Sequence, residues 1–334
     1  MRKSHKIRIA SRYFVRFSFL AVLLIISVFI SSCASSSKQA STATNFHTGS
    51  QGIQMRFIQD RPPAKIYDQD PSAMQVLVEI QNMGTYTLRG SDLLLSLSGF
   101  DRSIIQVPQA PQNQNSISLE GRKATFPDGG IDIVSWRSPG SITLPRNADV
   151  YSPTLQVTAC YKYRTEAAPV VCIDPTPYAA VNQNDVCSVT DVSVSGGQGA
   201  PVAVTSVKPT IYSPTTGKVA QFQIFVQNVG GGDVLSPGGD VLSRCYQKNL
   251  KFEDQNKVGI TAQMGSSLLS CNPAIINLVE GRGGYTFCTL TLGPQGSDSA
   301  YTTPLQITLD YTYRQSITRN VQIVKTPGSN QYYS

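Results

Sequence analysis

Histidine is scarce in this sequence, and the cysteines lack metal-site spacing. Of the two histidines among 334 residues, His5 lies in the basic N-terminal stretch, so His47 is the single imidazole of the remaining chain. Catalytic triads and multi-histidine metal sites need imidazoles held by a folded scaffold, whereas His47 lies in a Ser/Thr-rich stretch. Close Cys-x-x-Cys spacing, which zinc sites favour, is absent. We therefore expect a protein that is not an enzyme and uses no cofactor or metal.

Acidic residues are absent from the first part of the chain, so the net charge of the whole sequence is higher than that of its body. The formal charge is +7, from 28 basic and 21 acidic residues. Six of the basic residues precede residue 17, and no acidic residue precedes Cys33, so 22 basic and 21 acidic residues remain beyond the leader. A nearly neutral body lacks the positive field that attracts nucleic acid, so we expect no nucleic-acid partner.

The N-terminus has the organisation of an export signal. Residues 1–16 are basic, and the apolar run Phe17–Ile30 follows them. The next residues complete Ile30-Ser31-Ser32-Cys33, which resembles the lipobox of exported lipoproteins. The resemblance implies that residues 1–32 are a signal peptide and that Cys33 becomes the lipidated first residue of the mature chain.

Two other interpretations of the leader remain open. The uncharged run Phe17–Ser37 is about long enough for an uncleaved membrane helix, which needs roughly 20 residues. A cleaved and fully secreted form is the third possibility. All three place the body of the chain outside the cytoplasm, and we expect it to be membrane-anchored at the cell surface. Residues 33–52 are small and polar, which predicts a flexible tether.

Beyond residue 52 the pattern is that of a β protein. Short runs of alternating apolar and polar residues are broken by Gly, Pro, Asn and Asp, and no window of 12 or more residues has a convincing helical period. In Gln75–Gly84, Val76, Val78 and Ile80 alternate with polar residues and precede an Asn-x-Gly turn signal. This pattern predicts an all-β sandwich.

An internal repeat sets the number of domains. QVLVEIQNMG (Gln75–Gly84) recurs as QFQIFVQNVG (Gln221–Gly230), where Phe222, Ile224 and Val226 take the inward positions. YSPTLQVTACYKYR (Tyr151–Arg164) recurs 150 residues later as YTTPLQITLDYTYR (Tyr301–Arg314). Glu120-Gly121-Arg122 likewise recurs as Glu280-Gly281-Arg282. The expected organisation is a β-sandwich over 53–175, a linker over 176–186, a second β-sandwich over 187–326 and a tail over 327–334.

The repeated strands end in tyrosines that share one face. In the first repeat this face holds Leu155, Val157, Ala159, Tyr161 and Tyr163, and their counterparts follow in the second repeat. Tyrosine suits a half-buried sheet face, so we expect the hydroxyl groups to reach the rim of the sandwich.

The strand order and the Asn-x-Gly turn resemble immunoglobulin-like domains of exported surface proteins. The closest resemblance is to the CARDB-like family of bacterial and archaeal adhesion-related domains, and it is carried by VAQFQIFVQNVGGGDV (Val219–Val234). The first repeat departs from it, because Met83-Gly84-Thr85 replaces the glycine-rich segment. The resemblance implies two tandem immunoglobulin-like domains, without fixing a function.

Six cysteines follow Cys33, and an even number in an exported chain predicts three disulfides. Cys160 and Cys172 flank a predicted hairpin around Thr165–Pro169, which predicts a bridge between them. Cys271 and Cys288 flank the turn at Glu280-Gly281-Arg282 and form the second predicted pair. The remaining pair is Cys187 with Cys245.

Other candidate sites are weak. Two acidic pairs, Asp68 with Asp70 and Asp128 with Asp132, could hold calcium, but turn-forming aspartates beside Gly or Pro explain them better. Trp136 is the single tryptophan, and we expect it in a sandwich core rather than as a platform for sugars. The carboxylates that could serve a glycosidase are scattered and have no motif around them; they are Glu79, Glu120 and Glu280.

The function predicted is therefore non-catalytic binding. The first hypothesis is an adhesion, scaffold or envelope-assembly role, in which rigid domains present loops or a sheet edge to an envelope protein or a glycan. The alternative is a carbohydrate- or peptide-binding lipoprotein that serves a transporter or an enzyme complex. An extracellular hydrolase is the weakest hypothesis, because no acid–base pair is visible.

Overall fold

The structure, a computed structural model, describes residues 45–327 apart from short gaps. The gaps are 71–73, 108–111, 114–116, 141, 177–185, 213, 215–216, 239, 248–249 and 293–298. The predictions for residues 1–44, including the lipidated Cys33, and for the tail at 328–334 lie outside the described residues. The chain from Asn45 onward forms one compact unit.

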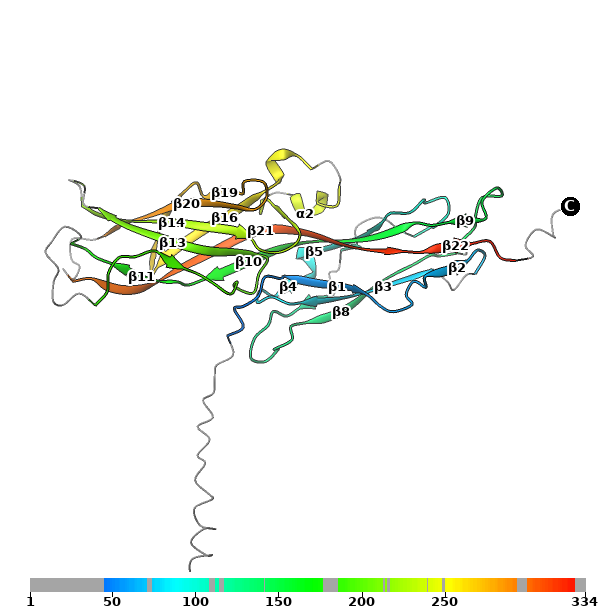
Figure 1. Cartoon of the computed structure of the whole chain (residues 1–334), viewed down its shortest axis with the longest axis horizontal. Coiled ribbons are helices and arrows are strands. Elements are labelled where there is room, and N and C mark those ends of the chain that lie inside the picture. Colours follow the sequence, from blue (N-terminus) through cyan, green and yellow to red (C-terminus); the bar gives the residue numbers. More distant parts are fainter. Residues whose placement is uncertain are drawn as a thin grey trace, which may run out of the picture. The chain divides into compact units, whose positions relative to one another are not determined.

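One long sheet runs through the described body (Figure 1). Its strands, in spatial order, are β17 (Ser267–Leu268), β16 (Lys257–Met264), β21 (Tyr301–Asn320), β10 (Thr154–Ala167), β5 (Leu93–Ser98) and β6 (Gln112–Asn113). Three further strands pair beside this path: β11 (Val170–Ile173) and β15 (Asp233–Leu235) with β21, and β19 (Ile275–Asn277) with β16. The order reads as three strands of the second repeat followed by three strands of the first.

Two smaller sheets pack on this long sheet. One has the order β1 (Ile53–Phe57), β3 (Gln75–Asn82), β8 (Ile131–Arg137). The other has the order β12 (Val192–Ser193), β13 (Val202–Tyr212), β14 (Lys218–Asn228), β20 (Gly283–Leu292), β18 (Ser270–Asn272). Two sheets of short strands lie in the first half. One consists of β2 (Lys65–Tyr67), β22 (Gln322–Val324) and β9 (Val150–Tyr151), and the other of β4 (Leu88–Arg89) and β7 (Ser118–Leu119). The described helical turns are η1 (Gly90–Asp92), α2 (Val241–Arg244) and η2 (Phe252–Asp254).

The all-β prediction is confirmed, and so are the inward positions read from the alternation. Val76, Val78 and Ile80 of β3 are fully buried, as are Phe222, Ile224 and Val226 of β14. β3 and β14 end at the asparagine of each Asn-x-Gly motif, Asn82 and Asn228. The period of two therefore placed the apolar face of each repeat correctly.

The two repeats share a sheet and a core instead of packing separately. The C-terminal strands of the repeats pair antiparallel over the whole of β10, from Thr154 opposite Asn320 to Ala167 opposite Ile307. A single cluster of buried apolar residues extends from Ile53 to Ile323 and includes members from both repeats. The boundary expected between residues 175 and 187 thus does not separate two packing units.

Four tyrosines lie at the centre of this shared sheet. Tyr161 is opposite Tyr313, and Tyr163 is opposite Tyr311. Because paired residues project to the same side of a sheet, the four rings lie together, and their centroids are 5.7–6.4 Å apart within the group. None of the four side chains is more than 2% exposed. The expectation that their hydroxyls reach the rim is wrong, because the four rings lie inside the core that the two repeats share.

The hydroxyls are satisfied by the same partners in both repeats. Tyr163 donates to the Asn82 side-chain oxygen at 3.1 Å, and Tyr313 donates to that of Asn228 at 3.1 Å. Each asparagine also donates its side-chain NH2 to one backbone carbonyl of the following loop and to one of a distant segment: Tyr86 and Leu119 for Asn82, Gly232 and Gly281 for Asn228. The Asn-x-Gly motif therefore ends a strand and also binds the tyrosine of its own repeat, which satisfies a polar group inside the core.

The glycine of the motif makes room for the tyrosine. A Cβ atom on Gly230 would lie 2.4 Å from the Tyr313 hydroxyl oxygen, and Gly84 has the same relation to Tyr163. Any larger residue would displace the ring that its neighbouring asparagine binds.

Two of the three predicted disulfide pairs are wrong. Cys160 pairs with Cys245 and Cys172 pairs with Cys187, whereas Cys271 pairs with Cys288 as predicted. The segment taken for a hairpin at Thr165–Pro169 is extended: Val170 lies opposite Pro304, so β11 continues β10 along β21 in the same register. Twelve extended residues separate Cys160 from Cys172 by about 40 Å, far beyond the reach of a disulfide.

The Cys160–Cys245 bridge fixes a second apolar cluster. Cys160 projects to the face opposite the tyrosines, where the segment around α2 covers it. The cluster consists of Cys160, Leu235, Val241, Leu242, Cys245 and Leu250, with Leu94 packed against it. Since Cys245 belongs to the second repeat and Cys160 to the first, this disulfide joins the repeats covalently.

The disulfide connectivity is directly testable. We expect peptide mapping without reduction to recover the Cys160–Cys245, Cys172–Cys187 and Cys271–Cys288 peptides, because these pairs have Cα separations of 6.3, 6.0 and 4.0 Å. Recovery of a Cys160–Cys172 peptide would contradict the extended β10–β11 segment. A reduced and alkylated sample serves as the control.

Stability should fall at alkaline pH because of the buried tyrosines. Burial raises the pKa of Tyr313 to about 12, and it also raises the pKa of Tyr161, Tyr163 and Tyr311 above the ordinary value of 10. Above pH 10 the unfolded chain loses these protons before the folded chain does. The free energy of unfolding should then fall by up to about 1.4 kcal/mol per pH unit for each tyrosine.

Urea titrations between pH 8 and pH 12 measure this slope. Tyr313→Phe should make the slope shallower, although it also lowers stability at neutral pH by leaving Asn228 and the Gly232 amide without their partner. An unchanged slope in Tyr313→Phe would show that this hydroxyl does not carry the effect.

Candidate functional site

Trp136 is a core residue and not a platform for sugars. The side chain lies in β8, is 1% exposed and belongs to the apolar core, as the sequence analysis expected. Stacking of a ligand on this ring is therefore excluded in the folded protein.

The candidate glycosidase carboxylates lie in three separate environments. Glu79 forms an ion pair with Arg56 at 2.6 Å on the outer face of its sheet. Glu120 binds Lys123 at 2.7 Å, and this hydrogen bond lowers the pKa of the carboxyl group. Glu280 lies in a turn with a positive φ of 51°.

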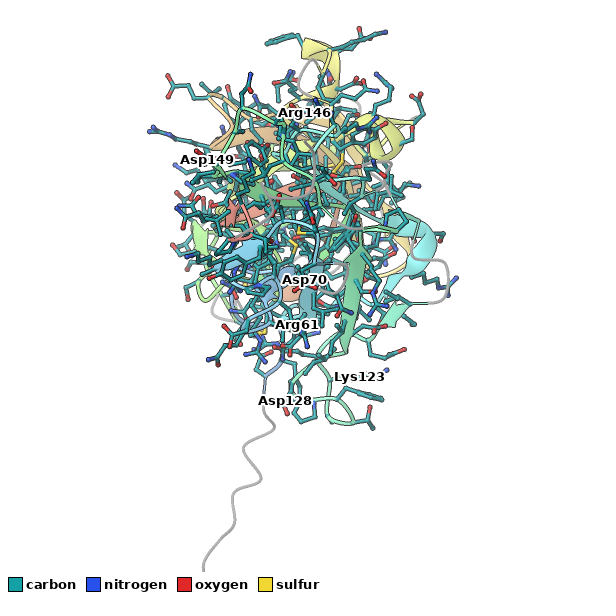
Figure 2. All side chains as sticks on the ribbon, turned by 90° about the vertical axis from the view of Figure 1, so that its right-hand side faces the viewer. Arg61, Asp70, Lys123, Asp128, Arg146 and Asp149 are labelled. Atoms are coloured by element: carbon teal, nitrogen blue, oxygen red, sulfur yellow. A yellow bond between two sulfur atoms is a disulfide. The ribbon has the colours of Figure 1, made fainter. Side chains whose placement is uncertain are left out.

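The two acidic pairs do not form a common site. The side chain of Asp68 is buried and accepts a hydrogen bond of 2.5 Å from the Thr326 amide, so it binds the segment after β22. Asp132 accepts from the Ile133 amide at 2.7 Å. Figure 2 shows Asp70 and Asp128 well apart from each other. Among the described residues, no three His, Cys, Asp or Glu side chains lie together as metal ligands.

Two adjoining cavities, of about 650 and 450 Å³, meet at His47 and Glu166. We call them together the junction groove. The floor of the larger cavity comes from three neighbouring strands: Glu166 of β10 is opposite Thr308 of β21, which in turn is opposite Thr261 of β16. The next row holds Gln306 and Gln263, whose side chains are hydrogen-bonded to each other.

The wall of the groove is built by residues expected in the flexible tether. The Gly49 amide donates to the Gly196 carbonyl at 2.8 Å, and the Gly199 amide donates to the Gly49 carbonyl at 3.1 Å. Arg122 donates to the carbonyls of Phe46 and Thr48. Residues 45–49 thus link the Glu120–Arg122 turn of the first repeat to the 196–199 loop of the second.

The smaller cavity is more strongly charged than the larger one. Arg164 forms an ion pair with Asp310 at 2.8 Å, and the hydrogen bond to this carboxylate raises the pKa of the guanidinium group. Arg89 and Asp92 complete the charged lining. The larger cavity offers amides, hydroxyls and the Glu166 carboxylate, so the groove suits a polar ligand held by hydrogen bonds.

Sequence reasoning missed this groove, although part of its signal was present. Gly197 and Gly199 of the 196–199 loop have φ values of +65° and +67° and approach the N-terminal segment closely, and glycines are the residues that such a backbone favours. The pairing of β10 with β21 creates the floor, and no local pattern in the sequence encodes that pairing.

The described part of the chain contains no helix long and apolar enough to cross a membrane. Its three disulfides indicate folding in an oxidising, extracytoplasmic compartment. The apolar run at Phe17–Ile30 lies outside the described residues.

The comparisons with known proteins assign no family to this chain. No family model matches it, and no curated protein does. Among solved structures, the secreted serine protease VesC from Vibrio cholerae is similar at 9% identity over 80% of this chain, with a TM-score of 0.17. The chain covers 51% of that structure, about half its length. A similarity this low supports no conclusion about fold or activity.

The contact between the N-terminal segment and the 196–199 loop can be tested with two neighbouring glycines. A Cβ on Gly197 would lie 2.2 Å from the Gly49 carbonyl oxygen, whereas a Cβ on Gly196 would meet nothing within 4 Å. Both have positive φ, so both alanine variants share the backbone strain. We expect Gly197→Ala to expose residues 45–52 to limited proteolysis and Gly196→Ala to leave them protected. Equal protection in both variants would contradict the described contact.

Proposed function

We propose that this protein is a non-catalytic, membrane-anchored scaffold or adhesion protein of the cell envelope, built from two immunoglobulin-like halves. The observation that carries the proposal is the continuous sheet of β17, β16, β21, β10, β5 and β6. Because this sheet, its core and the Cys160–Cys245 bridge span both repeats, the halves cannot hinge about a linker. A rigid body suits a protein that holds partners in place.

Several observations support a binding role over a catalytic one. The Glu79 and Glu120 carboxylates are each ion-paired with a basic side chain, an arrangement that does not favour a pair of carboxylates for acid–base catalysis. The resemblance of Val219–Val234 to CARDB-like adhesion domains is consistent with the proposal but carries little weight, since no family model matches.

The surface proposed for the partner is the β8 edge. β8 is the last strand of its sheet, and no described strand pairs with its other side. Ile131 and Ile133 are 54% and 52% exposed on it. An open strand edge with apolar side chains favours addition of a strand or a loop from another protein.

Site-specific crosslinking on intact cells tests this proposal. A photocrosslinking residue replaces Ser135 on β8 in one variant and the exposed Val170 of β11 in a matched control. We expect one stoichiometric envelope protein to be captured from position 135 and not from position 170. A Cys33→Ala variant should lose this capture, because the body would no longer be anchored.

Three results would contradict the proposal. Equal capture from positions 135 and 170 would show random proximity, and no capture from position 135 would remove the scaffold role at this edge. Capture unchanged by Cys33→Ala would exclude anchoring through this cysteine.

A further inference from the structure

Three aromatic residues form an exposed cluster on the second small sheet. Phe225 of β14 lies opposite Tyr285 of β20, with ring centroids 5.7 Å apart, and Phe287 follows two residues later at 5.7 Å from Tyr285. Tyr285 is 51% exposed and Phe287 is 37% exposed. We call these three residues the aromatic face. Grouped apolar rings left in contact with water mark a binding surface more often than an isolated exposed side chain does.

The fold does not require these rings. The registers Gln81 opposite Ile131 and Gln227 opposite Gly283 align β3–β8 of the first repeat with β14–β20 of the second. At the three equivalent positions the first repeat has Glu79, Ile133 and Ser135. A sheet of the same strand order therefore forms without an aromatic face. Packing within the sheet does not explain why the second repeat has these three rings.

The side chains beside the rings are polar and nearly neutral. The row that contains Phe287 reads Lys208, Gln223, Phe287, Asn272 across four strands. The row that contains Tyr285 reads Ser206, Phe225, Tyr285. Lys208 is the single charged residue of the two rows. Its ammonium group lies 5.6 Å from the Phe225 centroid and 3.4 Å from Asp191, so its charge is balanced.

We propose that the aromatic face binds a neutral glycan chain. A hexopyranose ring has an apolar C–H face, which packs on an aromatic ring, and hydroxyl groups, which exchange hydrogen bonds with amides such as Gln223 and Asn272. An anionic ligand would have to compete with the balanced Lys208–Asp191 pair. Three separate rings and flanking amides in one plane of a sheet match this chemistry better than an apolar protein contact.

The spacing suits a chain rather than a single sugar. Tyr285 and Phe287 project from the same face of one strand, and alternate residues on a strand are about 6.6 Å apart. Each ring can therefore contact a different sugar residue. The inference is independent of the scaffold role at β8, which lies on the other small sheet.

The test uses the full chain with cellohexaose and chitohexaose as probes, measured by isothermal titration and by NMR shifts. We expect at least one probe to bind with a dissociation constant of roughly 1 mM or below. Tyr285→Ala and Phe287→Ala should each weaken binding by about tenfold, since loss of one stacked ring removes on the order of 1 kcal/mol. Tyr285→Phe keeps the ring and should retain most of the affinity.

Two control variants separate this site from other exposed apolar residues. Ile133→Ala changes the equivalent position of the first repeat, and Phe252→Ala removes a ring that is 89% exposed in η2. Both should bind the probes as the parent chain does. Melting temperature and disulfide mapping confirm that each variant is folded.

The proposal is overturned if neither probe binds to the parent chain. It is also overturned if Ile133→Ala or Phe252→Ala weakens binding as much as Tyr285→Ala. Capture of a protein partner through position 285 on intact cells, without affinity for either probe, would assign the aromatic face to a protein interface. None of these results affects the crosslinking outcome at β8, so the two proposals fail separately.

Discussion

The structure depends on the antiparallel pairing of β10 with β21. Each of these strands is the last long strand of its repeat, and together they place four tyrosines where both halves of the core meet. The rings are buried at a point where neither repeat could bury them alone. Their hydroxyls then require internal partners, because an unsatisfied hydroxyl in such a core costs several kcal/mol. The rest of the architecture supplies those partners.

The two repeats solve this requirement in the same way. Ile53 and Val202, at the starts of equivalent strands, donate their backbone amides to Tyr161 and Tyr311. Gln315 and Thr165, which occupy equivalent positions 150 residues apart, bind the same hydroxyls from the partner strand. Each repeat thus completes the polar contacts of the other. These reciprocal contacts explain why the sequences of the two repeats are most alike in the Asn-x-Gly motif and in the tyrosine strand.

Local features of the fold could be read from the sequence, whereas contacts between distant segments could not. Alternation identified the buried faces of β3 and β14, and the cross-strand neighbours Cys271 and Cys288 flank a recognisable turn. The segment Thr165–Pro169 was predicted as a hairpin, yet the pairing with β21 continues through it. This error produced both wrong disulfides. The aromatic face was also missed: alternation puts Phe225 on the outer face of β14, but it does not show that Tyr285 and Phe287 of β20 lie beside it.

The order of the long sheet has a consequence for how the molecule arose. The last strands of the two repeats, β10 and β21, lie side by side at its centre, and β5 and β16 pair with them in equivalent register on either side. This is the arrangement of a two-fold homodimer with an isologous interface, fused into one polypeptide. After fusion, the sequences of the two copies can change independently. One copy could gain Cys160 where the other has Asp310, and one could acquire rings where the other retains Glu79 and Ile133. Divergence after fusion therefore leaves a symmetric fold whose two halves have different surfaces.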